Sequence, residues 1–595
     1  MRELDYPFDG DYLLKKRISL KKELLKTNGL IEKRIAILGG STTSEIKNML
    51  ELFLLNFGIK PLFYESEYNR FYEDGMFDNP KLKEFAPDII YIHTSFRNII
   101  NLPEANDKSE EVNQMLENEF ERFENLWVHL TKEYGCGIIQ NNFELPFYRL
   151  YGNQDGVFSQ GYVGYVRRLN EKIADFARKH ENFYIHDIEY ESSLYGLEKW
   201  SDPLYWYMYK YAMCVPAIPF TAYGVATIIK AIFGKNKKVV CLDLDNTLWG
   251  GVIGDDGVEN IEIGQETPTG QAYAEFQEYL MKLRRSGILL TVNSKNDEKV
   301  ALSGFERPDM ILKENDFAAF KANWNPKDRN LDEMAKELNL LPESFVFADD
   351  NPAEREIIRQ SIEKVSIPKL TEPEHYIAAI DRAGYFETVS LSEDDLKRNE
   401  MYAANASRTR EQAKFTDYGE YLDSLQMKST IKGFESIYYA RISQLTNKSN
   451  QFNLTTKRCS QSEIERMATD DCYITLYGKL EDRFGDNGVV SVVAGEVDNG
   501  AVNILLWLMS CRVLKRDMEY AMLDELVKCC REKGVDTIRG FYYPTAKNSM
   551  VKDFYSTMGF DKISRDEAGN TEWVLKVDKN YINKNKHICV SSEEK

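Results

Sequence analysis

Short apolar runs recur along the first third of the chain, and each is followed by a polar turn and then a helical pattern. Runs of this kind occur at Arg34–Leu38, Asp88–Ile92 and Gly137–Ile139. Uninterrupted apolar strands that alternate with helices are typical of a parallel sheet buried on both faces. We therefore predict an α/β domain over residues 1–233, followed by the polar link Gly234–Lys237.

A second set of strand and helix patterns occupies residues 234–369. Its strands are predicted at residues 239–244, 288–292, 310–311 and 345–348. Such alternation favours a doubly wound sheet with its ligand site at the carboxyl ends of the strands. Residues 370–430 are rich in charge and helix formers and predict a helical connector. Residues 431–578 resume an α/β pattern, and residues 579–595 form a polar tail that we expect to fray.

Composition narrows the class of protein. A chain of 595 residues is too long to fold around a single hydrophobic core, so we predict a multidomain α/β protein. The 95 acidic and 76 basic residues give a net charge of −19, which argues against a general nucleic-acid binder. We identify no signal peptide and no apolar run approaching the roughly 20 residues of a membrane span. The nine scattered Cys favour reduced thiols, so we predict a cytoplasmic protein without a membrane partner.

The second predicted domain begins with a strand that delivers two carboxylates to its carboxyl end. Asp243 and Asp245 are separated by one residue in the segment 239–251. Two carboxylates at a buried strand end repel each other, and a hard dication with oxygen ligands compensates for that repulsion. Asp349 and Asp350 follow another apolar strand and can supply further oxygens. The pattern predicts a site for a hard dication.

Two further polar residues point to phosphate chemistry in the same domain. Phosphoryl transfer needs fixed donors or cations on the phosphate oxygens. Ser294 ends a third predicted strand and can donate a hydrogen bond, and Lys327 can neutralise phosphate charge.

These four elements, in this order, resemble the four motifs of the haloacid dehalogenase (HAD) superfamily. The run of residues 242–257, LDLDNTLWGGVIGDDG, is similar to the FkbH-like, subclass IIIC branch. The resemblance implies Asp243 as nucleophile and Asp245 as general acid/base. It implies that Asp243, the Asp245 carbonyl and Asp349 hold Mg²⁺, with Asp350 as acidic support. It also implies that Thr247 steadies the loop, and that Ser294 and Lys327 bind phosphate.

One position departs from that family pattern. Relatives carry Cys just before the Ser-Lys-Asn triplet, where this chain has Asn293. If that thiol takes part in chemistry, its task moves elsewhere in this protein.

The strand–turn–helix order of residues 502–533 resembles the pantetheine-binding part of a GNAT-type acyltransferase. The family loop carries two glycines that let the backbone approach a pyrophosphate, whereas this chain has Lys515 and Asp517 there. We expect Lys515 and Arg516 to compensate in part, and the loop to suit a carrier-protein phosphopantetheine arm better than acetyl-CoA. The resemblance assigns acyl or pantetheine contacts to Asn450, Arg512, Asn548 and Tyr555.

Cys511 lies at the predicted strand end of this domain, beside Arg512 and just before a helix. Cationic neighbours and a helix start both favour the thiolate. The resemblance implies that this thiol holds an acyl group as a thioester. The alternative is a packed, inert Cys.

The first domain resembles SGNH hydrolases through Gly39-Gly40-Ser41 after a strand. An esterase would need a His base in an Asp-x-x-His motif, but the nearest candidate, Asp202–Tyr205, contains no His. Asn142 is a candidate for an oxyanion position. We predict a non-catalytic SGNH-like docking module in which Ser41 caps the following helix.

FkbH-like proteins are implied to take the glyceryl group of 1,3-bisphosphoglycerate, to discard phosphate on the HAD domain and to transfer the acyl group to a carrier-protein thiol. The expected partners are therefore an acyl carrier protein and a small phosphorylated metabolite. Two alternatives stay open. The first is a phosphatase of a small phosphorylated metabolite, with the last domain as a lid. The second is a carrier-binding assembly module without catalysis.

Overall fold

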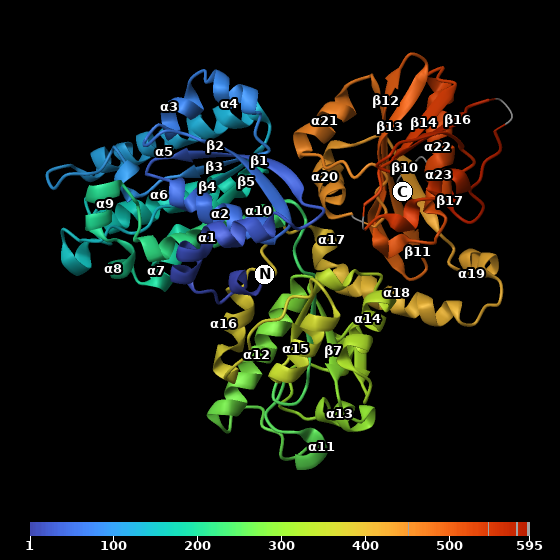
Figure 1. The fold of residues 1–595 in the computed structure, drawn as a ribbon, viewed down its shortest axis with the longest axis horizontal. Helices are drawn as coiled ribbons and strands as arrows, with labels where there is room; N and C mark the ends of the chain where they lie inside the picture. The colour runs from blue at the N-terminus through green and yellow to red at the C-terminus, as the bar shows by residue number, and fades with distance from the viewer. Residues whose placement is uncertain (450, 546, 579–580, 592–595) are drawn as a thin grey trace. The chain divides into compact units, whose positions relative to one another are not determined.

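The computed structural model describes residues 1–449, 451–545, 547–578 and 581–591. The chain divides into two compact units, Met1–Ile232 and Phe233–Lys595 (Figure 1). The predicted multidomain α/β class is confirmed, because parallel sheets with helical crossovers occur in both units.

The first unit is built on a five-stranded, wholly parallel sheet in the order β2-β1-β3-β4-β5. The strands are β1 (Ile31–Gly39), β2 (Ile59–Glu65), β3 (Ile89–His93), β4 (Gly137–Asn141) and β5 (Phe183–His186). Every residue of β3 is buried, as expected for a strand covered on both faces. The helices are α1 (Gly10–Leu24), α2 (Ser44–Asn56), α3 (Phe71–Met76), α4 (Pro80–Phe85), α5 (Ser109–Tyr134), α6 (Tyr162–Lys179), α7 (Ile188–Tyr195), α8 (Leu197–Trp200), α9 (Pro203–Tyr209) and α10 (Ile218–Ile232).

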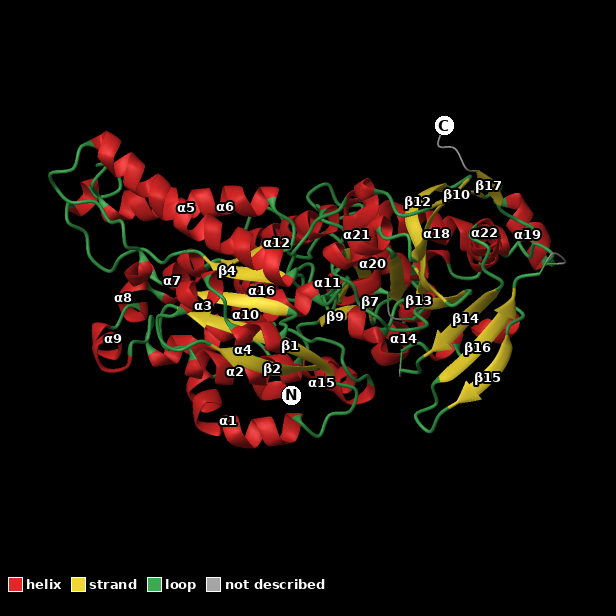
Figure 2. Ribbon diagram, turned by 90° about the horizontal axis from the view of Figure 1, so that it is seen from above, coloured by secondary structure: helices red, strands yellow, loops and turns green. Residues whose placement is uncertain are grey.

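Helices cover both faces of this sheet (Figure 2). Side chains of α3, α5 and α6 form one core with the face of β1, β3 and β4 that carries Leu38, Ile92 and Ile138. Helices α2 and α10 pack against each other. The segment Val215–Ile232 is apolar and long enough, by length and composition, to cross a membrane, contrary to the expectation from the sequence. It is 72% buried within the protein.

The second unit begins with a four-stranded parallel sheet in the order β8-β7-β6-β9. Its strands are β6 (Val239–Leu242), β7 (Leu289–Ser294), β8 (Ala319–Ala322) and β9 (Phe345–Ala348), and its helices are α11 (Ile253–Asp256), α12 (Pro268–Arg285), α13 (Glu298–Gly304), α14 (Lys327–Glu337) and α15 (Pro352–Ser361). The strand predicted at residues 310–311 is wrong. The backbone N–H groups of Ile311 and Leu312 donate to Oε1 of Gln277, so a side chain replaces a neighbouring strand.

Four helices follow this sheet: α16 (Tyr376–Asp381), α17 (Glu393–Leu396), α18 (Arg398–Gln412) and α19 (Tyr418–Ser424). The chain then enters an eight-stranded mixed sheet, ordered β15-β16-β14-β13-β12-β11-β10-β17. Its strands are β10 (Lys428–Lys432), β11 (Tyr473–Asp482), β12 (Gly485–Asp498), β13 (Ala501–Met509), β14 (Thr537–Tyr542), β15 (Asp561–Arg565), β16 (Thr571–Lys576) and β17 (Cys589–Ser591), and its helices are α20 (Tyr439–Lys448), α21 (Gln461–Thr469), α22 (Met518–Glu532) and α23 (Phe554–Thr557).

The described part of the tail does not simply fray, as we had expected. Strand β17 pairs in parallel with β10, and the N–H of Cys589 donates to the carbonyl oxygen of Met427 at 3.0 Å. The backbone of this short polar segment thereby gains sheet hydrogen bonds that its composition did not suggest.

Candidate active site

The carboxyl ends of β6 and β9 bring three carboxylates together. The two strands pair in parallel with Leu242 opposite Ala348, so the residues that follow them emerge side by side. The N–H of Asp243 donates to the Ala348 carbonyl at 3.0 Å, which fixes this alignment. One carboxylate oxygen each from Asp243, Asp349 and Asp350 lies within 4.8 Å of the others.

Lys327, at the start of α14, joins two of these carboxylates. Its Nζ lies 2.9 Å from Oδ2 of Asp243 and 2.6 Å from Oδ2 of Asp349. The lysine side chain is only 3% exposed. Burial by itself lowers the pKa of Lys327, but the charges of Asp243 and Asp349 outweigh burial and raise that pKa. The lysine is therefore a fixed cation beside the predicted nucleophile.

In an isolated ion pair the cation lowers the pKa of its carboxylate partner. Here burial and neighbouring negative charge instead raise the pKa values of the carboxylates beside Lys327. Burial, together with the charge of Asp243, raises the pKa of Asp349 to about 7 despite Lys327. The same two causes raise the pKa of Asp350. More negative charge is gathered here than one lysine can neutralise, which favours an additional cation.

The donor set fits a hard divalent ion. Oδ1 of Asp243 is buried and has no hydrogen-bond partner among the described residues. Asp243 belongs to a group whose other members, Asp349 and Asp350, also offer carboxylate oxygens. Mg²⁺ prefers carboxylate and carbonyl oxygens and keeps several waters, so these residues suit it.

Asp245 is held apart from that cluster. Its Oδ1 accepts hydrogen bonds from Nε1 of Trp249 at 3.0 Å and from the N–H of Ile253 at 3.1 Å. Its Oδ2 accepts one from Nδ2 of Asn296 at 2.8 Å. Its side chain is not among the three clustered carboxylates, which suits a proton-transfer role. Sequence reasoning missed Trp249 and Asn296, although Asn296 lies only two residues beyond Ser294.

The other residues predicted in this domain lie around the same strand ends. Oγ1 of Thr247 accepts a hydrogen bond from the N–H of Asp350 at 3.2 Å and so ties the two acidic loops together. Ser294 ends β7 and is buried, with its Oγ 3.2 Å from Nδ2 of Asn296. Nδ2 of Asn293 donates to the carbonyl oxygen of Lys327 at 2.8 Å. The residue that replaces the family cysteine therefore positions the start of α14.

The structure does not bring Cys511 and Arg512 to this cluster. They line a separate pocket with Lys238, which precedes β6, and Ser344, which precedes β9. That pocket lies at the amino ends of the strands whose carboxyl ends carry Asp243 and Asp349. Lys238 and Asp243 are five residues apart along an extended strand, or roughly 16 Å.

The loop from Arg512 to Asp517 contains no glycine, but two of its residues have the backbone conformation that glycine favours. Lys515 and Asp517 have φ angles of 64° and 61°, in the left-handed region that glycine adopts most readily. The expectation that Arg516 compensates a pyrophosphate is wrong, because this side chain is buried and pairs with Asp482 at 3.2 Å.

The remaining predicted contacts of the last domain are structural or lie outside the described residues. Oδ1 of Asn548 accepts from the N–H of Thr545 at 2.7 Å, and its Nδ2 donates to the carbonyl oxygen of Asn453 at 2.9 Å. Tyr555 is 1% exposed and packs against Trp507. Both residues therefore serve the core here. Asn450 lies outside the described residues.

In the first unit, Ser41 does not cap the following helix. Helix α2 begins at Ser44 with Thr43 before it, and the buried Oγ of Ser41 has no partner among the described residues. Asn142 is engaged at both ends of its amide. It donates to Oδ1 of Asp187 at 2.7 Å and accepts from the N–H of Glu189 at 3.1 Å.

Comparison with known proteins supports part of this assignment. Residues 34–230 match the FkbH N-terminal domain family. The chain is similar to the N-terminal part of the protein BF1531 from Bacteroides fragilis, which contains a phosphatase domain and was crystallised with Mg. That likeness has 30% identity and a TM-score of 0.58, and it covers 63% of this chain and 99% of the other. A comparison with curated proteins gave no match.

Solved acetyltransferases are also similar to part of the chain. One is the PaiA N-acetyltransferase from Thermoplasma acidophilum in complex with coenzyme A, at 15% identity, over 25% of this chain and 99% of that one. Another is the ribosomal-protein-S18-alanine N-acetyltransferase from Escherichia coli, at 13% identity, over 26% and 99%. Both have TM-scores of 0.20, too low to bear on the fold or the function. The FkbH resemblance is thus confirmed for residues 34–230, while the GNAT and SGNH resemblances stay predictions.

Proposed function

The chain belongs to the family of the phosphatase-domain protein from Bacteroides fragilis, and from that premise we propose that it is a Mg²⁺-dependent phosphatase that also transfers an acyl group to a carrier-protein thiol. The observation that carries the first half is the placement of Lys327 between Asp243 and Asp349, beside the unpartnered Oδ1 of Asp243.

In the proposed phosphoryl transfer, an oxygen of Asp243 attacks phosphorus and the bond from phosphorus to the leaving oxygen breaks. Asp245 gives its proton to that oxygen. It then takes a proton from water, which attacks the aspartyl phosphate, releases phosphate and restores Asp243. Lys327 and Ser294 contact the phosphate oxygens, where charge develops. When bound, Mg²⁺ supplies further positive charge among Asp243, Asp349 and Asp350.

In the proposed acyl transfer, the Cys511 thiolate attacks the carbonyl carbon of an acyl phosphate such as 1,3-bisphosphoglycerate. The bond from carbon to the phosphate oxygen breaks, and phosphate leaves. The pantetheine thiol of a carrier protein then gives its proton to water, attacks the thioester as a thiolate and displaces Cys511 as thiolate. The remaining phosphate ester is a substrate for Asp243. Because the two sites lie at opposite ends of β6, the acyl group must travel between them, and a flexible carrier arm can provide that movement.

The separation of Cys511 from Asp243 favours one alternative, a phosphatase of a small phosphorylated metabolite that needs no acyl transfer. One assay distinguishes the two. The protein is incubated with Mg²⁺, 1,3-bisphosphoglycerate and holo-carrier protein. Released phosphate is measured, and the carrier is weighed by mass spectrometry.

A glyceryl mass shift on the carrier, lost in Cys511→Ser, supports transfer through the thioester. Phosphate release without any shift supports the simpler phosphatase. Asp243→Asn should abolish hydrolysis of the phosphate ester in both cases, and Asp498→Asn, at an exposed position, is the matched control. If Asp243→Asn hydrolyses the ester as fast as the wild type, the assignment of the phosphatase site is wrong.

A further inference from the structure

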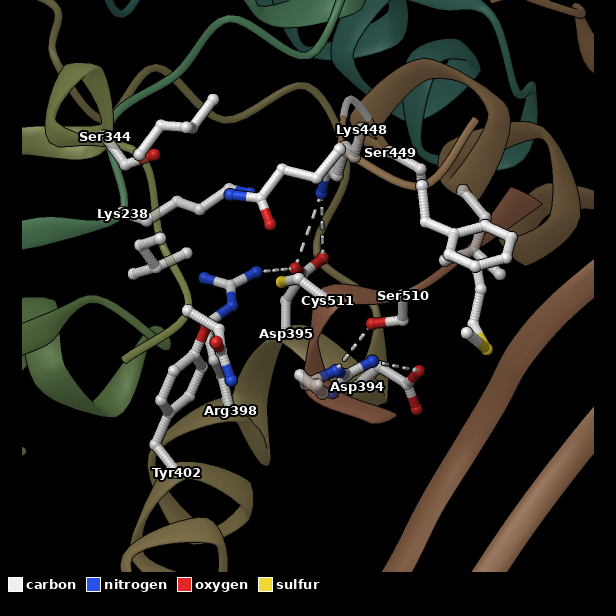
Figure 3. A pocket seen from close by; sticks show the side chains of 18 of the residues that line it. Lys238, Ser344, Asp394, Asp395, Arg398, Tyr402, Lys448, Ser449, Ser510 and Cys511 are labelled. Carbon is white, nitrogen blue, oxygen red and sulfur yellow. Dashed lines mark hydrogen bonds and ion pairs between the residues drawn. The ribbon is translucent and has the colours of Figure 1, made fainter. Parts of the chain in front are cut away.

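The pocket that contains Cys511 is lined from two sides of the second unit. Lys238 and Ser344 reach it from the amino ends of β6 and β9, and Lys448 reaches it from the end of α20. Figure 3 labels Lys238, Ser344, Lys448 and Cys511 among the side chains that line this pocket, and dashed lines join Lys448 to the carboxylate of Asp395. The pocket is therefore formed jointly by the four-stranded sheet that contains β6 and β9 and by the last domain.

Cations outnumber carboxylates in this pocket. Five basic side chains line it, namely Lys238, Arg398, Arg441, Lys448 and Arg512. Three acidic side chains, Glu343, Asp394 and Asp395, face them. Glu343 is also 2.5 Å from Nζ of Lys547, which is not among the lining residues. Five minus three leaves an excess of two positive charges before Lys547 is counted.

Two aspartates neutralise four of these cations only in part. Asp394 lies 2.8 Å from Arg441 and 3.4 Å from Arg512. Asp395 pairs with Arg398 and lies 3.4 Å from Lys448. The buried Nε of Arg441 has no hydrogen-bond partner among the described residues.

Lys238 is the cation without a counter-charge in direct contact. No described residue forms a hydrogen bond or ion pair with its Nζ. Its backbone N–H donates to the carbonyl oxygen of Ser344. Burial lowers the pKa of Lys238, and Arg398 and Arg512 lower it further. Burial, Arg398 and Arg441 likewise lower the pKa of Lys448 to about 8, although Asp395 opposes them. Crowded, partly buried cations of this kind are stabilised by a bound anion.

We propose that this pocket is a second anion site, which binds a phosphate group between Lys238, Lys448 and Arg441 with the Cys511 thiol beside it. A phosphate dianion offsets two of the excess positive charges, and its oxygens accept the hydrogen bonds that Lys238 and Arg441 leave unused. Tyr402 contacts Cys511, and burial together with Cys511 raises the pKa of its hydroxyl, so that the hydroxyl stays protonated. The site is separate from Asp243 and does not depend on phosphate hydrolysis there.

The phosphate can be free phosphate or part of a pantetheine arm, and both share the same chemistry at the cations. The test is the rate at which iodoacetamide alkylates Cys511, followed on its peptide by mass spectrometry. The full chain is used in EDTA at constant ionic strength. Cys472 and Cys589, which are exposed, serve as internal references. The ligands are inorganic phosphate, S-methyl phosphopantetheine and S-methyl pantetheine, which lacks the phosphate.

Inorganic phosphate should slow the alkylation of Cys511 saturably and leave Cys472 unchanged. S-methyl phosphopantetheine should act at lower concentration if the arm is the source, and S-methyl pantetheine should not protect. Lys238→Met should raise the half-protecting concentration about tenfold, equivalent to about 1.4 kcal/mol. The matched control is Lys586→Met at an exposed position. Asp243→Asn should keep full protection, which separates this proposal from the assignment of the phosphatase site.

Calorimetry of phosphate binding to the wild type and to Lys238→Met gives a second readout that does not require a reactive thiol. The proposal is overturned if phosphate neither protects Cys511 nor binds more weakly to Lys238→Met. It is also overturned if S-methyl pantetheine protects as well as its phosphorylated form.

Discussion

Nζ of Lys327 lies 2.9 Å from Oδ2 of Asp243, so the first residue of α14 supplies the counter-charge to the residue that follows β6. The same lysine is 2.6 Å from Asp349 after β9. One cation therefore connects three segments that are far apart in sequence. Because all three groups are buried, their interaction bears on both stability and catalysis.

Lys327→Met should destabilise the second unit by about 3 kcal/mol, because it leaves buried carboxylates without their cation. Mg²⁺ should raise the melting temperature of this variant more than that of the wild type, since a divalent ion replaces the missing charge. Phosphate release should fall about a hundredfold. Thermal unfolding with and without Mg²⁺, together with a phosphate assay, measures both effects.

Lys321→Met is the control for that variant. Lys321 is only partly buried and lies 3.7 Å and 3.8 Å from Glu333 and Glu337, so its loss should cost under about 1 kcal/mol. Equal stability of the two variants would show that the buried pairs of Lys327 contribute nothing.

Asn296→Ala should reduce kcat about tenfold and leave KM nearly unchanged. Asn296 donates to Oδ2 of Asp245, and its removal frees a carboxylate that two other donors hold only through Oδ1. Steady-state kinetics of phosphate release measure the change. Asn325→Ala, at an exposed position of the same domain, should leave both constants unaltered. An unaltered kcat in Asn296→Ala would mean that the orientation of Asp245 does not limit the reaction.

Glu144 should make the stability of the first unit depend on pH. Burial raises the pKa of this carboxyl to about 8, from an ordinary value of 4.5, while the N–H of Phe96 donates to Oε1 at 3.2 Å. The folded form therefore keeps a proton that the unfolded chain loses. Its contribution is full below pH 4.5 and is lost as the pH rises to about 8, by at most about 1.4 kcal/mol per pH unit.

The measurement is urea unfolding of the wild type and of Glu144→Gln between pH 4.5 and 8. The free energy of unfolding of the wild type should fall relative to that of the variant across this window. Glu198→Gln, at an exposed position, should track the wild type. Parallel pH profiles for the wild type and Glu144→Gln would contradict the raised pKa.

Asp482→Asn should destabilise the second unit by about 3–5 kcal/mol, because it leaves two buried arginines without their counter-charge. Arg408 binds both carboxylate oxygens of Asp482, at 2.8 Å and 2.6 Å, and Arg516 pairs with the same group at 3.2 Å. Denaturant unfolding measures the loss. Asp498→Asn should cost far less, and similar midpoints for the two variants would rule out this network as a source of stability.

The sequence by itself determined the α/β class and the grouping of Asp243, Lys327, Asp349 and Asp350. Parallel strands present their carboxyl ends at one edge of a sheet, so acidic residues that follow two neighbouring strands lie close together. Thr247 and Ser294 lie there for the same reason.

Only the tertiary structure decided what depends on contacts between distant segments. Oε1 of Gln277 accepts hydrogen bonds from the backbone N–H groups of residues 311–312, which therefore form no strand. Asp482 forms an ion pair with Arg516, which is then not free to bind a pyrophosphate. Cys511 lies at the amino edge of the sheet, away from Asp243, because the last domain packs there. The pattern of apolar residues along a strand indicates which residues are buried, but not which segment packs against them. That segment decides whether a polar side chain is already hydrogen-bonded or is available to a ligand.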